Sequence, residues 1–416
     1  MQSNRRQTGR AGCALFAASE SRVYLDYNAT TPVDPAVLEA MLPFLGASFG
    51  NAGSVHTPGQ LARAAVDAAR DSVAWLIGAA PNEIIFTSGG TESDNLAIFG
   101  TVAASTKPRK HVITTAIEHH AVLHACEELS RQGVEVTVVP VRRGPDAQGI
   151  VDPEEIRRAI RPETVLITVM QANNELGTIQ PIEEIARMAA EAGVCFHCDA
   201  VQSAGKVPLD VGKLGVDLLS VSAHKFCGPK GVGALYVRAG RPISPRAWGG
   251  HAERDRRAGT ENVPGIVGIG KAAELARNVL ADDGARIRSL RDHLETTLLE
   301  RIPNVRLNGD RDRRVPNTSN LSFPGAGGEA LLIALDLQGL ACSTGAACSS
   351  GSTEPSHVLL AAGLSHDDAR SSLRFSLGRP STAADVDRAI EIIPQVVERI
   401  RALSPREQEA TAIDAR

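Results

Sequence analysis

Short apolar runs alternate with longer amphipathic segments in the middle of the chain, from residue 83 to residue 237. The runs predict strands at Glu83–Thr87, His111–Thr115, Val134–Val139, Val165–Met170, Val194–Cys198, Leu218–Val221 and Gly233–Val237. Between them, apolar residues recur every three to four positions and predict helices at 88–103, His120–Gln132, Asp152–Ile160 and Ile182–Ala192. Strands that alternate with helices predict an α/β fold, with a mostly parallel mixed sheet covered by helices on both faces.

The flanking segments follow other patterns. A short strand beginning at Val23 breaks into a turn before Pro32, and helices are predicted at Val33–Leu45 and Leu61–Ile77. From about Ala285 the pattern becomes that of a smaller α+β domain. Its predicted helices are Ala285–Arg301, Glu329–Leu337 and Ala383–Leu403, and its predicted strands are Val305–Asn308, Asn320–Phe323 and Ser372–Ser376.

These patterns divide the chain into three parts. Residues 1–20 are predicted to be a disordered tail, and residues 36–284 to form the large domain. Residues 21–35 and 285–416 form the small domain, which carries a loop of small residues at 341–356 that we expect to be mobile. Arg5, Arg6 and Arg10, with no acid among the first 19 residues, would also suit an organelle targeting segment.

Composition narrows the function classes. The chain has 416 residues, of which 43% are hydrophobic and 22% charged, as in globular proteins. A net charge of -4 and 3% aromatic residues argue against direct nucleic-acid binding, and no apolar run has the length of a membrane span. Seven irregularly spaced cysteines favour a reducing cytoplasm over a disulfide framework.

One stretch indicates covalent chemistry at a lysine. The apolar run Val216–Leu219 leads to Ser222-Ala-His224-Lys225, and a Gly-Pro-Lys-Gly turn follows. A lysine held at a strand end and partly desolvated can act as a nucleophile toward carbonyl groups. Taken alone, the same pattern also fits a solvated loop lysine.

Other predicted strands also end in polar turns. Ser88-Gly-Gly90-Thr91 opens a helix, where bare N–H groups can bind phosphate, although a tight turn capped by Thr91 fits equally well. His119 follows the next strand and either stacks on a flat ligand or caps a helix. Asn174 follows another strand, where it either reaches a phenolate or carboxylate oxygen or is an ordinary turn residue.

Asp199 directly follows an apolar strand, where a buried carboxylate requires a cationic partner. A protonated pyridine nitrogen would supply that charge, and Gln202 would bond an oxygen of the same ring. The nearby pair Cys195 and Cys198 lies three residues apart on a strand, so the two thiols face opposite sides. We therefore expect no metal or redox site there.

Together, these turns predict a pyridoxal 5'-phosphate site. Lys225 would bind the cofactor covalently, and Asp199 would keep its pyridine ring protonated as an electron sink. Ser222 and His224 would add hydrogen bonds to the phosphate.

The chain closely resembles the cysteine desulfurases, which are fold-type I pyridoxal phosphate enzymes of the class V aminotransferase superfamily. The resemblance extends from about Tyr24 to Leu403. Its carriers are the segments 24–35 (YLDYNATTPVDP), 86–95 (FTSGGTESDN), 173–177 (NNELG), 222–225 (SAHK), 257–262 (RAGTEN), 348–352 (CSSGS) and 374–378 (RFSLG).

The resemblance implies a role for each matching residue. Gly90, Thr91, Ser222 and His224 would hold the phosphate, Asn174, Asp199 and Gln202 the ring, and His119 would stack on it. Thr260 would reach the phosphate of the neighbouring subunit, which implies a homodimer. Asn51 and Arg374 would bind the carboxylate of the substrate, L-cysteine.

Cys348 resembles the catalytic cysteine, which would take the sulfur as a persulfide and leave L-alanine. Lys225 would move the Cα proton, and His119 is a candidate proton acceptor for the thiol. A protein acceptor would then receive the sulfur, for iron–sulfur cluster assembly or another pathway. The alternatives are a selenocysteine lyase or other class V enzyme, and a sulfur-transfer scaffold whose site has decayed. The segment before Arg257 departs from the family pattern at His251, Ala252 and Asp255.

Overall fold

The structure, a computed structural model, describes residues 22–144, 148–344 and 354–403. In this part of the chain the largest sheet has seven strands in the order β2-β8-β7-β6-β5-β3-β4. Their bounds are β2 Ile84–Thr87, β3 His111–Thr115, β4 Glu135–Val139, β5 Thr164–Met170, β6 Cys195–Asp199, β7 Leu218–Ser222 and β8 Gly233–Val237. Only β8 runs against its neighbours, β2 and β7, so the predicted mostly parallel sheet is confirmed.

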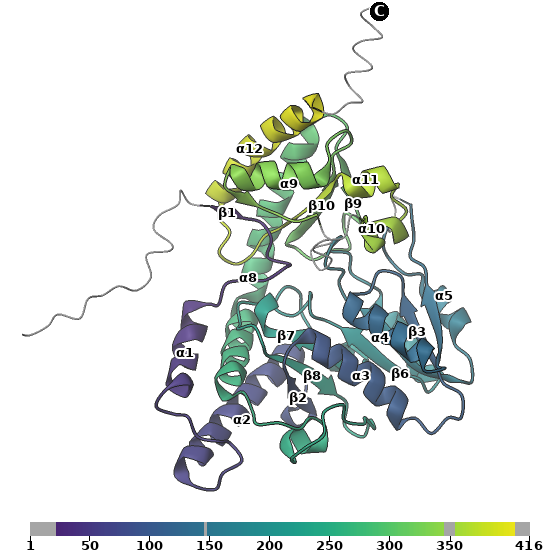
Figure 1. Cartoon of the computed structure of the whole chain (residues 1–416), viewed down its shortest axis with the longest axis vertical. Coiled ribbons are helices and arrows are strands. Elements are labelled where there is room, and N and C mark those ends of the chain that lie inside the picture. The colour runs from purple at the N-terminus through teal and green to yellow at the C-terminus, as the bar shows by residue number, and fades with distance from the viewer. Residues whose placement is uncertain (1–21, 145–147, 345–353, 404–416) are drawn as a thin grey trace, which may run out of the picture.

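Helices cover both faces of this sheet (Figure 1). They are α1 Pro35–Leu45, α2 Thr57–Ile77, α3 Gly90–Ala104, α4 His120–Arg131, α5 Pro153–Ala159, α6 Ile182–Glu191 and α7 Val211–Leu214. Neighbouring β5 residues show the two faces: Ile167 packs in the cluster that includes α2 and α6, and Leu166 packs in the cluster that includes α3 and α4. Both faces are therefore buried, as the continuous apolar strands require.

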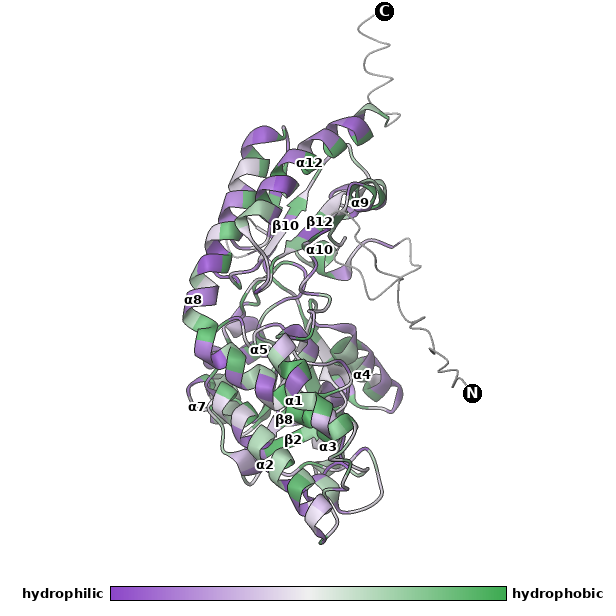
Figure 2. Ribbon diagram, turned by 90° about the vertical axis from the view of Figure 1, so that its left-hand side faces the viewer, coloured by the Kyte–Doolittle hydropathy of each residue, from purple (hydrophilic) through white to green (hydrophobic). Residues whose placement is uncertain are grey.

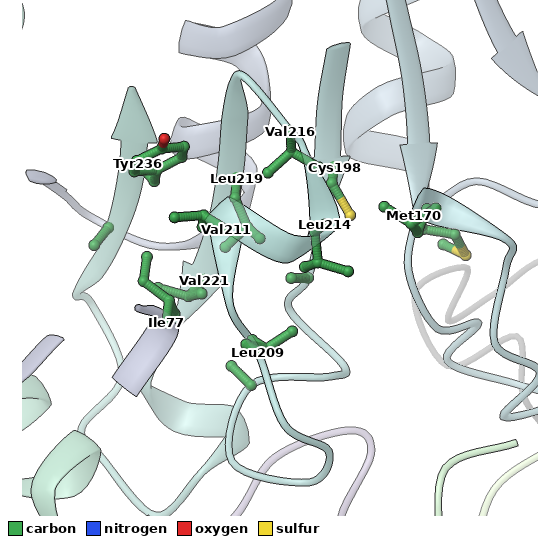
Figure 3. Packing of buried hydrophobic residues seen from close by; sticks show 14 of the residues in the cluster. Ile77, Met170, Cys198, Leu209, Val211, Leu214, Val216, Leu219, Val221 and Tyr236 are labelled. Carbon is green, nitrogen blue, oxygen red and sulfur yellow. The ribbon is translucent and has the colours of Figure 1, made fainter. Parts of the chain in front are cut away.

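Figure 3 shows part of the first cluster, in which Leu219 of β7 lies near Cys198 of β6 and Val221 of β7 lies near Ile77. Cys195, at the other end of β6, packs in the clusters that include α3 and α4. The two thiols thus face opposite sides of the sheet, as their spacing predicts. Among the described residues, no group of histidine, cysteine, aspartate and glutamate side chains could hold a metal ion.

A second hydrophobic core lies in the upper part of Figure 1. It is formed by β1 Val23–Tyr24, β9 Arg306–Asn308, β10 Thr318–Ser322, β11 Leu340–Ala341, β12 Ser372–Ser376, α9 Gly328–Leu337, α12 Ala383–Ala402 and the end of α8. The short helices α10 His357–Ala361 and α11 His366–Arg370 follow residues 341–356 in the chain. Strand β1 of this second core precedes α1 in the chain.

Helix α8, Val263–Arg301, connects the two cores and runs along one side of the molecule in Figure 2. The predicted start at Ala285 was wrong, and the helix begins at Val263. Its first turns contain glycines, which have low helix propensity and concealed the helical period. They serve close packing, because a Cβ on Gly270 would lie 2.6 Å from the Cα of Ala69 in α2.

Some predictions concern residues outside the described ranges. They are the tail at residues 1–20, most of the loop at 341–356 and, within that loop, Cys348. None of the helices in the described ranges combines the length and the apolar content that crossing a bilayer requires.

Candidate active site

A cavity of about 410 Å³ opens at the carboxyl ends of the parallel strands. Because these strands share one direction, the turns that follow them meet at one edge of the sheet. Ten of the residues predicted for the site line it: Gly90, Thr91, His119, Asn174, Asp199, Gln202, Ser222, His224, Lys225 and Arg374. These residues come from segments as distant in sequence as α3 and β12, and the fold brings them together.

Lys225 ends the short 3-10 helix η2 (Ala223–Lys225) that directly follows β7. Its Nζ donates hydrogen bonds to the main-chain oxygens of Asn28 at 2.7 Å and Ala29 at 2.8 Å. The same N-terminal segment also donates to the backbone beside the lysine, since Thr31 N donates to His224 O at 2.9 Å. The lysine is therefore held at the cavity wall, as a nucleophilic amine requires.

The glycine turn before α3 forms another wall. Gly89 has a φ of 155°, a conformation that favours glycine, and a Cβ on Gly90 would lie 2.8 Å from Val201 Cγ2. The turn precedes a 15-residue helix whose first N–H groups have no partner within the helix. Ser222 lies across the turn, with its Oγ 3.8 Å from a Cβ built on Gly89. Backbone donors at a helix N-terminus beside a serine hydroxyl suit a phosphate group.

Asp199 is the last residue of β6, and its carboxylate is buried. Its Oδ1 accepts a hydrogen bond from Val201 N at 2.9 Å, but none of the ion pairs among the described residues includes it. Burial raises the pKa of Asp199 to about 6, although the Val201 N–H and the charge of Lys225 oppose the increase. A buried carboxylate that forms no ion pair within the described part of the chain fits a ligand that brings its own positive charge.

The position of His119 is compatible with both predicted roles, a helix cap and a contact to a ligand. It is the N-cap of α4, where its Nδ1 accepts from Ala121 N at 3.1 Å, and it also lines the cavity. Burial first, and then the charge of Lys225, lower the pKa of His119 to about 4. The ring is therefore neutral near pH 7, with Nδ1 as an acceptor, so its proton is on Nε2.

Arg374 of β12 is buried and reaches the cavity from the second core. Its NH2 lies 2.6 Å from Asp26 Oδ1, and its NH1 donates to Asn174 O at 2.9 Å. Its Nε is buried without a hydrogen-bond partner among the described residues. Asp26 holds the guanidinium of Arg374 in place, and the guanidinium can still donate hydrogen bonds to the carboxylate of a ligand.

Two predicted residues do not join this group. Asn51 and Thr260 are exposed, and neither lines the cavity. Asn51 Oδ1 instead accepts from Gly53 N at 2.8 Å within its own loop. Their proposed contacts thus remain predictions, and Cys348 lies outside the described residues.

The segment before Thr260 has an unusual backbone. Glu253, Arg254 and Asp255 have φ values of 47°, 56° and 63°, which side chains other than glycine seldom adopt. Glu253 anchors the segment, because its buried carboxylate pairs with both terminal nitrogens of Arg70 at 2.8 Å. Asp255, one of the positions that depart from the family pattern, adopts the left-handed conformation, and its Oδ1 lies 2.6 Å from His251 Nδ1.

Asn28, Asp26 and Lys206 were not predicted as site residues. Asn28 O accepts from Lys225 Nζ and from Gln202 Nε2, and Asn28 Oδ1 accepts from Lys206 Nζ at 2.8 Å. Asn28 and Asp26 lie in the motif 24–35, which carries the family resemblance and could have indicated them. Lys206 lies four residues from its partner Gln202, but its contact with Asn28 is 178 residues away in sequence and could not be predicted locally.

Comparison with known proteins agrees with this geometry. The family model described as "Aminotransferase class-V" matches residues 23–389. A protein of Methanosarcina thermophila named "Cysteine desulfurase IscS" is 52% identical over 383 residues, covering 92% of this chain and 94% of the relative. The chain belongs to the class V aminotransferases, in the cysteine desulfurase family. The predicted resemblance and enzyme class are thereby confirmed.

Solved structures of this family confirm the fold. A structure titled "NIFS-LIKE PROTEIN" has a TM-score of 0.84 and 39% identity, and the match covers 91% of this chain and 99% of the other. A structure titled "SspA in complex with cysteine" has a TM-score of 0.76 and 37% identity, and covers 86% and 99% respectively. As a class V aminotransferase, the chain places its cavity where enzymes with parallel sheets bind their ligands.

Proposed function

We propose that the protein is a pyridoxal phosphate-dependent cysteine desulfurase, which converts L-cysteine to L-alanine and transfers the sulfur as a persulfide on Cys348. The observation that carries the proposal is the convergence on one cavity of Lys225, the Gly89–Gly90 turn and the buried Asp199, which forms no ion pair among the residues that the structure describes. An amine, an anion and a phosphate cradle are the three groups that this cofactor requires. The curated relatives named cysteine desulfurase support the reaction.

The residues present fit the cofactor. Lys225 would hold it covalently, Asp199 would face its ring nitrogen, and Gln202 would donate to a ring oxygen. Gly90, Thr91, Ser222 and His224 would hold its phosphate, and His119 and Asn174 would contact the ring. When bound, the cofactor supplies an electron sink for the carbon next to the amino group.

The protein residues would then act on the substrate directly. Arg374, held by Asp26, binds the carboxylate, and the cysteine in the SspA structure title supports this choice of substrate. Lys225 Nζ accepts the Cα proton. The Cys348 thiolate attacks the substrate sulfur, the carbon–sulfur bond breaks, and protonation of the carbon side completes alanine. One persulfide forms for each alanine, so no external oxidant or reductant is needed.

The five cysteines that the structure describes support Cys348 as the nucleophile. Cys126, Cys195, Cys198, Cys227 and Cys342 are free thiols, and burial raises the pKa of each of them. For Cys342, the described cysteine closest in sequence to Cys348, the pKa rises to about 12. A thiol that stays protonated is a poor nucleophile. Free thiols also fit the cytoplasm, which we propose as the location.

The working form would be a homodimer in which Thr260 contributes to the partner's site. Exposed apolar side chains near α1 support a second copy as the partner; they are Leu38, Leu42, Leu45, Phe49 and Val55. Thr260 is exposed and outside its own cavity, as a residue that acts across an interface must be. Mixing inactive Lys225→Ala and Thr260→Ala chains should restore part of the activity, and no restoration would contradict the shared site.

The sulfur would pass from Cys348 to a protein acceptor. The name IscS of the curated relatives supports iron–sulfur cluster assembly as the pathway, and we propose this use of the sulfur.

The test measures alanine and sulfide formed from L-cysteine under reductant. Lys225→Ala should lose both products by at least ~1000-fold, because both the covalent attachment and the proton transfer are lost. Cys348→Ala should lose sulfide to a similar degree, whereas the matched control Cys342→Ala should retain it if it folds. Sulfide release by Cys348→Ala at the wild-type rate would overturn the proposal.

A further inference from the structure

A second lysine lies beside Lys225. The Nζ of Lys206 donates hydrogen bonds to Gln202 Oε1 at 2.7 Å and to Asn28 Oδ1 at 2.8 Å. Lys225 Nζ donates to the main-chain oxygen of the same Asn28 at 2.7 Å. A single asparagine therefore joins the two amines, one through its side chain and the other through its backbone.

No carboxylate balances the charge of Lys206, which takes part in none of the ion pairs among the described residues. The titratable groups that act on it most are Lys225, Arg374 and Cys227, and a small adjoining cavity adds Tyr27, Asp283 and Arg379. Burial, followed by the charges of Lys225 and Arg374, lowers the pKa of Lys206 well below its usual value. An anionic ligand in the main cavity would supply the missing negative charge and oppose this shift.

Lys206 and the Asn28 carbonyl together orient the amide of Gln202. The carbonyl oxygen of the Gln202 amide is occupied by Lys206 Nζ, and its Nε2 donates to Asn28 O at 3.0 Å. The two contacts specify the same orientation, because an ammonium can only donate to the amide oxygen and the Asn28 carbonyl can only accept from the amide nitrogen. Gln202 lines the main cavity, so its orientation affects what the cavity can bind.

We propose that Lys206 is a positioning residue of the active site. It orients Gln202 and Asn28, and it places a positive charge beside Lys225 that lowers the pH at which the lysine-bound cofactor loses its proton. The proposal rests on the cofactor proposed above. A nearby cation disfavours a further positive charge, so the direction of the effect follows from Coulomb's law.

The test is a pH titration of the visible absorbance of the purified holoenzyme. Lys206→Met keeps the length of the side chain without its charge, and it should raise the titration midpoint by about one pH unit, a tenfold change in proton affinity. Lys206→Arg retains the charge and should leave the midpoint nearer to the wild-type value. Lys213→Met is the matched control, because the side chain of Lys213 is 81% exposed. It should titrate as the wild type does.

If Lys206→Met does not fold, Asn28→Asp decides the question. This variant puts a carboxylate of the same size where Oδ1 lies 2.8 Å from Lys206 Nζ, which neutralises the charge in place. An upward shift supports the proposal, and an unchanged midpoint in a folded neutral variant overturns it. The wild-type protein separates the two proposals, since a wild type without visible absorbance would contradict the cofactor and not Lys206 alone.

Discussion

The molecule holds buried charges in two different ways. In the second core, Arg314 and Glu295 form a complete pair, with NH1–Oε2 at 2.6 Å and NH2–Oε1 at 2.8 Å, and Ser319 Oγ also donates to the carboxylate. Asp199 at the main cavity and Lys206 at the small cavity beside it are without an ion-pair partner among the described residues. The pKa of Glu295 is lowered, whereas the pKa of Asp199 rises to about 6.

This difference separates structural charges from functional ones. A satisfied pair such as Arg314–Glu295 needs nothing from outside the protein. The charges at the cavity are held in place by hydrogen bonds but not neutralised, so they favour a ligand that carries the complementary charges. Such a site makes the ligand-free protein less stable, and binding of the ligand restores the lost stability.

Breaking the structural pair should have the largest effect on folding. Arg314→Met leaves Glu295 buried without its cation, and we expect a loss of about 3–5 kcal/mol in the free energy of unfolding. Denaturant unfolding measures this loss. Arg314→Met combined with Glu295→Leu should lose less, because no uncompensated charge remains. The folded fraction of either variant should still bind the cofactor, and loss of binding would contradict the distinction.

Removing the charge of Asp199 should have the opposite pattern, a loss of activity without a loss of stability. Asp199→Asn should reduce cysteine turnover by about 10²–10³-fold, on the scale of other preorganised electrostatic groups, while the cofactor-free protein should keep or gain stability near pH 7. Alanine formation and denaturant unfolding measure the two effects. If Asp199→Asn stays active but loses stability, Asp199 is a structural charge like Glu295 and not a functional one.

The sign of the pH effect follows from the pKa of Asp199. Because that pKa is raised from 3.8 to about 6 in the folded cofactor-free protein, the folded state binds more protons than the unfolded state between these values. The contribution of Asp199 to stability is therefore fully present below pH 4 and is lost as the pH rises through about 6. Asp199→Asn should abolish this part of the pH dependence.

The smallest expected effect concerns two helix-capping residues, one at the cavity and one outside it. His119 caps α4, and Thr382 caps α12 with its side chain accepting from Asp385 N at 3.2 Å. Changing either residue to alanine should cost about 1 kcal/mol of stability. Only His119→Ala should also change the absorbance of the holoenzyme, since Thr382 does not line the cavity. Equal spectra for both variants would show that His119 acts as a cap alone.

The pKa of His119 adds one expectation. Since this pKa is about 4, the ring stays neutral from pH 5 upward, and any inflection of the activity profile above pH 5 must come from another group. Comparing the pH–rate profiles of wild type and His119→Asn tests this. If the wild type shows an inflection above pH 5 that His119→Asn lacks, the inflection belongs to His119 and the expectation is wrong.

Much of the fold was predictable because its signals are local. Strands β3 and β8 have their predicted bounds, and the polar turns after the strands mark the edge where the cavity opens. Short elements such as α7 and β11 were missed, since a few residues carry no clear period. The start of α8 was missed because its glycines serve contact with α2, a packing requirement that the local sequence does not reveal.

The sequence by itself determined the order of most strands and helices along the chain and the polar strand-end turns, because apolar period and residue type act within a few residues. It also predicted roles for Lys225 and Asp199 from their places at strand ends and, through the family resemblance, a role for Arg374. Only the tertiary structure decided that Asn28 joins Lys225 to Lys206, that Asp26 holds Arg374, and that Thr260 and Asn51 lie outside the cavity. Asn28 and Lys225 are 197 residues apart, and hydrogen bonds over such separations depend on how the whole chain packs.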